Sequence, residues 1–387
     1  MGVQRGIITY GLTEDSDTAA VSSVATANSF ARLTNIYNWN AGPTAGADAS
    51  RFSDDFSCTC LLTDSTTVSV TRRAAATDED MDAAFEVIEF PGTGDDAAIV
   101  RMHQNITLST SEATLDTAIS GVSTIGNCVP IICGVSHAGT SNQKQRSSVS
   151  AQIVDVSGAQ IRLTRGVASS ELIVSVAVVE FTGANWSVQQ NISHTQSVVD
   201  TVETEACSAV TWAETMIFSS IQAGSSAAGP DSNQCAVWPG ATTTTVKFQG
   251  GSTGSTTYAH LVSNANLAVE SIDSLDGSET IVNWDGSDPD VKNKTVSAST
   301  LADHFLVISG FSTEGSAAME FFNWNYRLST TTNIEFFVAR SASSGFDADW
   351  AAQLIDISGL NFGGGGGIGL SQQGTLGMNI MSGGFRQ

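Results

Sequence analysis

Two near copies of one apolar segment decide the fold: Ala84-Phe85-Glu86-Val87-Ile88-Glu89-Phe90 and Val174-Ser175-Val176-Ala177-Val178-Val179-Glu180-Phe181. Each copy follows a hairpin in which apolar and polar residues alternate, as in Val68-Ser69-Val70-Thr71-Arg72 and Ile161-Arg162-Leu163-Thr164-Arg165. Alternation with a period of two and enrichment in Val, Ile and Phe are typical of β-strands. The sequence therefore predicts a repeated unit made of a hairpin and a closing strand.

Two weaker copies extend the repeat along the rest of the chain. The third contains Cys235-Ala236-Val237-Trp238 and closes with the strand from Leu261 to Glu270, and the fourth contains Ile334-Glu335-Phe336-Phe337. An acid stands in each closing strand, at intervals of about 90 residues: Glu89, Glu180, Glu270 and Asp356. This period is too long for a solenoid repeat and suits a complete small β-domain with its own core.

We therefore expect an all-β protein of four tandem β-sandwich domains, Ig-like or jelly-roll-like, of about 90 residues each. The expected domains are residues 1–94, 95–183, 184–276 and 277–362, followed by a Gly-rich arm over residues 363–387. Because the linkers between them are short, we expect neighbouring domains to be held close, as a stiff rod or a compact tile.

The charge of the chain excludes several classes of partner. The 387 residues include 39 Asp plus Glu against 16 Lys plus Arg, a formal net charge of -23, and no basic run is present. Nucleic acids and anionic membranes are bound by clustered Lys and Arg. We therefore expect no nucleic-acid partner and no membrane insertion, and the first residues lack the pattern of an export signal.

The cysteines are expected to be reduced. Six are present, and none forms a Cys-x-x-Cys pair. Cys58 and Cys60 would lie on one face of a strand with parallel side chains, which is a poor geometry for a disulfide. We interpret them as thiols of the core.

No motif predicts catalysis or a resident cofactor. The Gly-x-Ser-x-Gly match at 250–254 lies in a Gly/Ser/Thr loop, not between a strand and a helix, and residues 363–369 lack the βαβ setting of a dinucleotide site. The five histidines have no metal-ligand spacing. With one acid per domain, we expect these acids to face solvent or to pair with an Arg on a neighbouring strand, because Arg72, Arg165 and Arg340 also recur. We expect no enzyme activity.

Two weaker hypotheses concern ligands. Carboxylates crowd the expected linker near residue 285, and calcium prefers such oxygens, so the weak calcium candidates are Asp285, Asp288 and Asp290. A solvated acidic loop is the alternative. Aromatic and amide side chains alternate around residues 37–40 and 323–326, so the possible glycan contacts are Tyr37, Trp39, Trp324 and Tyr326. Packing in a core or interface is the alternative there.

The Gly-rich arm is expected to act in assembly. Its apolar side chains are scattered among Gly, Ser and Gln and form no core of their own: Ile368, Leu370, Leu376, Met378, Ile380, Met381 and Phe385. They need a surface to pack against. We expect this surface on a neighbouring copy, which makes the protein a homo-oligomer, or on the last domain of the same chain.

The sequence resembles the virion structural proteins of tailed bacteriophages. The resemblance rests on the opening Val3-Gln4-Arg5-Gly6 and on the strands Val87-Ile88-Glu89-Phe90 and Val178-Val179-Glu180-Phe181, and it covers about the first 270 residues. It implies a place on the virion, after assembly in the host cytoplasm, with other virion proteins as partners. It supplies no catalytic residue.

The leading hypothesis is accordingly a tail fibre or adsorption-device component that presents sandwich domains for assembly and attachment to the host surface, through a glycan or another receptor. A capsid decoration or head fibre protein is the first alternative. A secreted adhesin or carbohydrate-binding module is the second, and an enzyme such as a depolymerase is the third.

Overall fold

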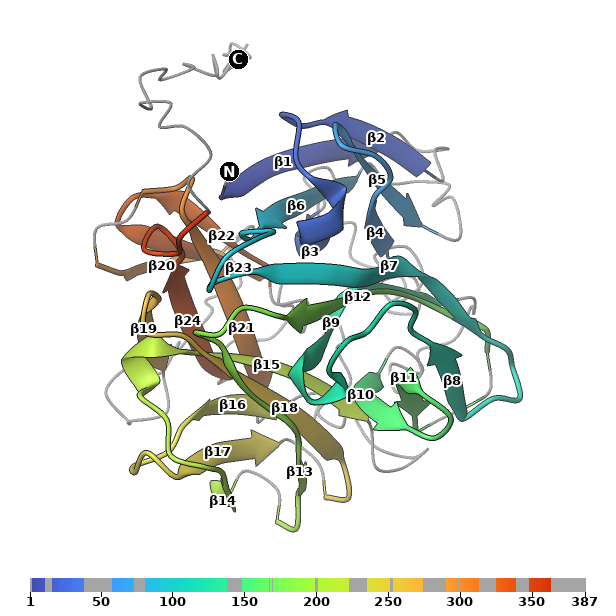
Figure 1. The fold of residues 1–387 in the computed structure, drawn as a ribbon. Coiled ribbons are helices and arrows are strands. Elements are labelled where there is room, and N and C mark those ends of the chain that lie inside the picture. Colours follow the sequence, from blue (N-terminus) through green and yellow to red (C-terminus); the bar gives the residue numbers. More distant parts are fainter. Residues whose placement is uncertain are drawn as a thin grey trace.

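The regular elements of the described residues are β-strands and short 3-10 helices, so the expected all-β, sandwich-type fold is confirmed (Figure 1). The computed structural model describes residues 2–10, 16–37, 58–72, 81–137, 148–166, 168, 170–198, 201–222, 235–250, 253–273, 290–297, 300–312, 325–338 and 348–362. The arm over residues 363–387 lies outside this part of the chain.

The strands form four groups of six, which we call units 1 to 4. Unit 1 contains β1 (Val3–Tyr10), β2 (Ser16–Ala20), the 3-10 helix η1 (Thr26–Asn28), β3 (Ser29–Tyr37), β4 (Cys58–Leu62), β5 (Thr67–Arg72) and β6 (Met81–Glu89). Unit 2 contains β7 (Ala98–Leu108), β8 (Thr114–Ala118), η2 (Ile125–Asn127), β9 (Cys128–His137), β10 (Val149–Asp155), β11 (Ala159–Arg165) and β12 (Leu172–Phe181). Unit 3 contains β13 (Ser187–Thr195), β14 (Glu203–Ala206), η4 (Trp212–Glu214), β15 (Thr215–Gln222), β16 (Cys235–Pro239), β17 (Thr245–Gly250) and β18 (Thr256–Ser263). Unit 4 contains β19 (Ala268–Asp273), β20 (Asp290–Thr295), β21 (His304–Ser312), β22 (Asn325–Thr330), β23 (Asn333–Val338) and β24 (Ala348–Asp356).

Every unit has the same topology. The first, sixth and third strands form one antiparallel sheet, in the order β1-β6-β3 in unit 1, and the second, fifth and fourth strands form another, in the order β2-β5-β4. We call these the inner and outer sheets. One pairing crosses units: Cys235 of β16 pairs with Gly310 of β21, which joins the outer sheet of unit 3 to the inner sheet of unit 4.

The third copy of the repeat was placed wrongly from the sequence. Register puts Ser263 in unit 3 opposite Thr215, where units 1 and 2 have Glu89 and Glu180. Glu270 lies in β19, which pairs with β24 of unit 4. Unit 3 therefore ends between Ser263 and Ala268, earlier than the expected boundary at residue 276. The expected boundary lies too late because Glu270, in the first strand of unit 4, resembles the acid that unit 3 lacks.

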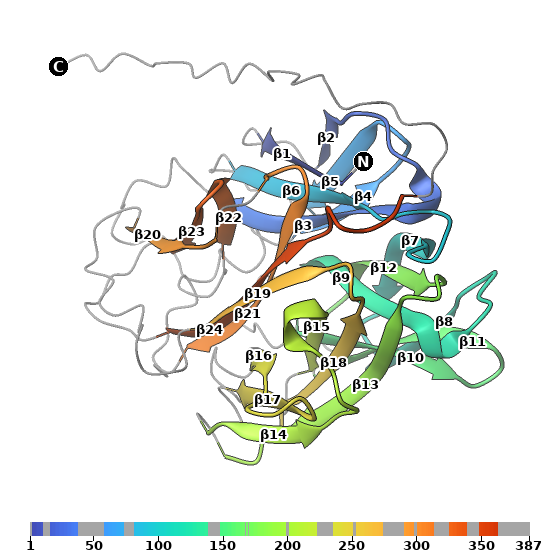
Figure 2. The same cartoon turned by 60° about the vertical axis from the view of Figure 1, so that its left-hand side comes forward.

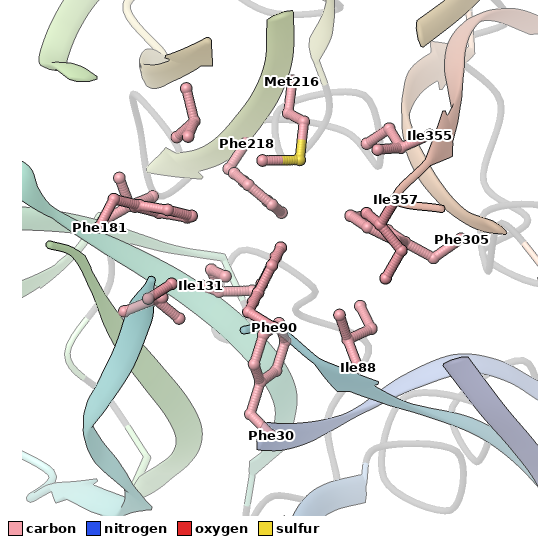
Figure 3. Packing of buried hydrophobic residues seen from close by; sticks show 14 of the residues in the cluster. Phe30, Ile88, Phe90, Ile131, Phe181, Met216, Phe218, Phe305, Ile355 and Ile357 are labelled. Carbon is pink, nitrogen blue, oxygen red and sulfur yellow. The ribbon is translucent and has the colours of Figure 1, made fainter. Parts of the chain in front are cut away.

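The inner sheets are buried on both faces. One face packs against the outer sheet of its own unit, as Val87 does, and the other packs into a central core, as Ile88 does. The central core draws on all four units (Figure 3). Its labelled members are Phe30, Ile88, Phe90, Ile131, Phe181, Met216, Phe218, Phe305, Ile355 and Ile357. The units therefore share a core in addition to their own, which the expectation of separate beads did not include.

The four units close into a ring around this core. The fourth strand of each unit lies against the third strand of the next: β4 on β9, β10 on β15, β16 on β21, and β22 on β3. Figures 1 and 2 show the units following one another around the centre, with the last unit beside the first. The outcome is a compact arrangement and not an extended rod.

Candidate functional site: an axial carboxylate and four junctions

One buried carboxylate joins the four inter-unit segments. Asp96 is fully buried, and it accepts hydrogen bonds from the side-chain amides of Asn185 (2.8 Å), Asn264 (2.9 Å) and Asn266 (2.9 Å) and from the backbone N–H of Asn361 (2.7 Å). Asp96 follows unit 1, Asn185 follows unit 2, Asn264 and Asn266 follow unit 3, and Asn361 follows unit 4. The segments that end all four units therefore converge on a single anion.

The hydrogen bonds outweigh the cost of burying this charge. Burial by itself raises the pKa of Asp96, but donation from Asn264, Asn361, Asn185 and Asn266 lowers it further, so the pKa lies below that of an ordinary aspartate. Asp96 is thus ionised at neutral pH. Each of its donors is neutral, so the group acts as a structural anion and offers no acid–base pair for catalysis.

Sequence reasoning missed this cluster, although a signal was present. An Asp or Asn followed by an apolar residue recurs a few positions after each closing strand, as Asp96-Ala97, Asn185-Trp186, Asn266-Leu267 and Asn361-Phe362. The apolar partners Trp186 and Leu267 belong to the central core, and Phe362 packs against it. In units 2 and 3 the pair thus places one polar and one apolar side chain at the axis, whereas in unit 4 the polar contact comes from the backbone N–H of Asn361.

Two acids of the closing strands, Glu89 and Glu180, are buried structural groups. Glu89 accepts the N–H of Ala25 (2.9 Å), and Glu180 accepts the N–H of Thr124 (2.6 Å), so each caps the turn before the third strand of its unit. Glu180 also binds Arg101 at 2.6 Å. Burial raises its pKa, but the bonds from Ser123, Thr124 and Arg101 lower it below the usual value.

The expected solvent exposure is wrong for Glu89 and Glu180, which are both buried, whereas the expected pairing with an Arg on a neighbouring strand is confirmed for Glu180 by Arg101 of β7. Arg165 is itself buried and donates to the carbonyls of Glu112 and Ser170, and Arg72 lies over the ring of Tyr10. Arg340 lies outside the described residues. Arg72 and Arg165 thus each contact residues of their own unit.

The junction between units 4 and 1 is closed by an ionic clasp. Glu86 is buried between Arg5 and Arg32, at 2.9 Å from each guanidinium. Both arginines also donate to backbone carbonyls of unit 4: Arg5 to Leu301 and His304, and Arg32 to Leu306. The first unit thus holds the last one through three carbonyl groups, and the carboxylate of Glu86 within unit 1 pairs with both arginines that reach them.

The other junctions use neutral side chains. Gln353 of unit 4 accepts the N–H of Ile217 (2.7 Å) and donates to the carbonyl of Thr215 (3.0 Å) in unit 3. His103 of unit 2 bonds to the carbonyl of Ala31 in unit 1 at 3.1 Å, and His260 of unit 3 to that of Ala151 in unit 2 at 3.2 Å. Burial lowers the pKa of both histidines to about 4, so both are neutral at pH 7.

Among the described residues, a grouping with the composition of a reactive site lies in unit 3. His194 contacts Glu203 (2.8 Å) and Glu205 (3.0 Å) through opposite ring nitrogens and stacks on Phe248. Because the carboxylates lie on opposite sides of the ring, they cannot share one metal ion with it. No set of three or more His, Cys, Asp or Glu suited to a metal ion occurs in the described ranges.

The ligand candidates from the sequence lie mostly outside the described residues. Asp290 begins β20, whereas Asp285 and Asp288 are not described. Tyr37 ends β3 and Tyr326 lies in β22, two strands that pack against each other at the junction of units 4 and 1. Trp39, Trp324 and the seven apolar residues of the arm are not described, so the calcium, glycan and arm hypotheses stay predictions.

The cysteines are free thiols, as expected, and a simple reaction checks their burial. Five are buried and Cys207 is partly exposed. Burial raises the pKa of Cys58 and Cys133 to about 12 and that of Cys235 to about 11, which removes the reactive thiolate. We expect Ellman's reagent to modify Cys207 alone before unfolding, and Cys207→Ser to abolish this phase. A fast phase that survives in Cys207→Ser contradicts the described burial.

No helix in the described part of the chain is long and apolar enough to cross a membrane. The chain matches no known protein family, no curated protein and no solved structure.

Proposed function

We propose that the protein is a non-enzymatic structural component of a tailed-phage virion, of the tail-fibre or adsorption-device type. One observation carries this proposal: the buried ionisable groups at the axis and at the closing junction hold units together. Asp96 is saturated by neutral donors, and Glu86 is saturated by Arg5 and Arg32. Such groups give rigidity and leave no pair of carboxylates facing a substrate.

The residues behind the virion resemblance all serve the ring. The N–H of Val3 donates to the carbonyl of Ala302 in unit 4 (2.6 Å), and Arg5 belongs to the ionic clasp. Gln4 both donates to and accepts from the backbone of Ser22. At Gly6 a Cβ atom would lie 2.4 Å from the ring of Phe85. The motif therefore supports a role in construction.

The unit ends support a role in display. In unit 1, Val3 and Ser29 pair with the end of β6 that leads to the linker, whereas Tyr10 and Tyr37 pair with its opposite end. The long connections over residues 38–57 and 73–80 leave from that opposite end. Connecting segments on a rigid scaffold are common places for binding residues. We assign host attachment, including the glycan hypothesis for Tyr37 and Tyr326, to this end.

Localisation on particles tests the proposal. Gold-labelled antibodies raised against the recombinant protein are expected to label purified virions at the tail. Labelling of the head would instead support the decoration alternative. Absence of the protein from purified virions, by labelling and by mass spectrometry, overturns both.

The arm hypothesis gives a separate prediction. Phe362 packs against the central core, so residues 363–387 start from the axis of the ring. We expect a chain ending at residue 362 to keep the melting temperature of the full chain and to lose incorporation into particles and self-association. Size-exclusion chromatography and particle assembly measure these effects. Normal incorporation of the truncated chain rejects the arm as an assembly element.

A further inference from the structure

We propose that His260 is a proton-operated latch between units 2 and 3: the neutral ring holds the junction closed, and the charged ring opens it. This inference is independent of the proposed virion role. It rests on which groups face the two ring nitrogens and on what one of those groups does for the junction.

The surroundings of His260 fix its proton on one nitrogen. Nδ1 lies 3.2 Å from the backbone N of Asn191, whose N–H can only donate, so Nδ1 must be the acceptor. Nε2 therefore carries the hydrogen and donates to the carbonyl of Ala151 at 3.2 Å. The side chain is 1% exposed. The ring is thus locked in its neutral Nε2–H form.

Asn191 links the protonation state of the His260 ring to unit 2, because it contacts both. It lies in a bulge of β13 where the register shifts between Gln189 and Ile192, and its φ of 58° is in the left-handed region. Its side chain bonds to both polar groups of the Ile153 backbone: Nδ2 donates to the carbonyl (2.7 Å), and Oδ1 accepts the N–H (3.2 Å). The Asn191 side chain thereby pairs with the Ile153 backbone as the backbone of a neighbouring strand would pair with β10.

Protonation of His260 breaks this arrangement. A proton on Nδ1 points at the N–H of Asn191, so one hydrogen bond is replaced by two opposed donors. No carboxylate compensates the charge. The described titratable groups on the strands packed around the ring are Asp155 of β10, His194 of β13 and Tyr258 of β18 itself. Asp155 bonds to Gly158 in an exposed turn, and His194 faces Glu203 and Glu205. Strand β15 contributes none.

Equivalent positions in the ring lack this response. Gln353 occupies the place of His260 in unit 4, and its amide does not titrate. Glu86 occupies it in unit 1, within the ionic clasp. His103, at the junction of units 1 and 2, bonds to the carbonyl of Ala31, which also accepts from a charged ring. Mild acid charges both histidines, because burial lowers the pKa of each to about 4, but of these two junctions only that of units 2 and 3 then has a ring proton that opposes an N–H group.

Hydrogen exchange of the full-length protein tests the latch. Burial lowers the pKa of His260 from 6.5 to about 4, so its contribution is complete above pH 6.5 and is lost as the pH falls towards 4. After correction for intrinsic rates, we expect the opening constants at the N–H groups of Asn191 and Ile153 to rise by up to about 150-fold between neutral pH and pH 4. Amides of Val68 and Val70 in unit 1 serve as the internal reference.

Two variants decide the cause. His260→Gln, which copies the residue of unit 4, should reduce the rise at Asn191 and Ile153 to below about threefold, and His103→Gln should leave it intact. An equal rise in wild type and His260→Gln, or its loss in His103→Gln, overturns the proposal. If His260→Gln does not fold, the ¹⁵N chemical shifts of the His260 ring in the wild-type protein provide the test. An Nδ1–H tautomer at pH 7.5, or protonation of the ring without loss of hydrogen-exchange protection at Asn191, overturns the proposal.

Discussion

Asp96→Ala is expected to lower the free energy of unfolding by about 4 kcal/mol at pH 7, because it removes the acceptor that the four inter-unit segments share. Asn264 is buried, so its Nδ2 donor loses its acceptor, although its Oδ1 still accepts the N–H of Asn266. Asn185, Asn266 and the N–H of Asn361 are more exposed and regain hydration, which limits the loss. Urea denaturation measures the effect.

The neighbouring Asp95 supplies a matched control. Its side chain is exposed, and only its backbone carbonyl is used, by the N–H of Asn185. We expect Asp95→Ala to change the free energy of unfolding by less than about 0.5 kcal/mol. Similar losses in both variants would show that the axial anion has no special role.

The pH dependence of the Asp96 variant has a defined sign. The folded pKa of Asp96 lies below its unfolded value, so its stabilisation is present above the unfolded pKa and is lost as the pH falls through the folded pKa. The difference between wild type and Asp96→Ala should therefore be constant at neutral pH and shrink only below the ordinary range of aspartate. A difference that shrinks already between pH 7 and 5 contradicts this assignment.

The repeat and the all-β class were predictable because alternation is a local property. Val68 and Val70 point into their own unit and Ser69 between them does not, as the period of two requires. The shared core was also visible in principle. Strand β12 is buried along nearly its whole length, and its almost uninterrupted apolar run is typical of a strand covered on both faces.

The contacts at the junctions could not be predicted, because the four units use equivalent positions for them but place different residue types there. Equivalent places in the four inner sheets hold Glu86, Ala177, His260 and Gln353, which differ in charge and size. Each is matched to a neighbour distant in sequence. Arg32, for example, reaches Leu306. A search for similar residues at a fixed spacing cannot detect such pairs, and the acid of unit 3 was misplaced for the same reason.

The ionic clasp gives the second large effect. Glu86→Ala leaves Arg32 buried without a carboxylate, and breaking a buried ion pair from one side costs about 3–5 kcal/mol. Arg5 is less affected, since its side chain is 22% exposed and can reach water. We therefore expect the loss to come mainly from Arg32 and to appear as faster exchange of the Val3 N–H, which bonds to Ala302 across the same junction.

Unit 2 supplies the control for this variant. There Ile131 faces Ala177 at the positions of Arg32 and Glu86, and the pair lies in the central core. The double variant Arg32→Ile/Glu86→Ala copies that solution and leaves no buried charge at Arg32, although it also removes the bond to Leu306 and the contact of Arg32 with Phe305. We expect it to be more stable than Glu86→Ala, with a coupling energy of about 2 kcal/mol in a double-mutant cycle. Strictly additive losses would mean that the clasp residues act separately, and that the ring is closed by its apolar core alone.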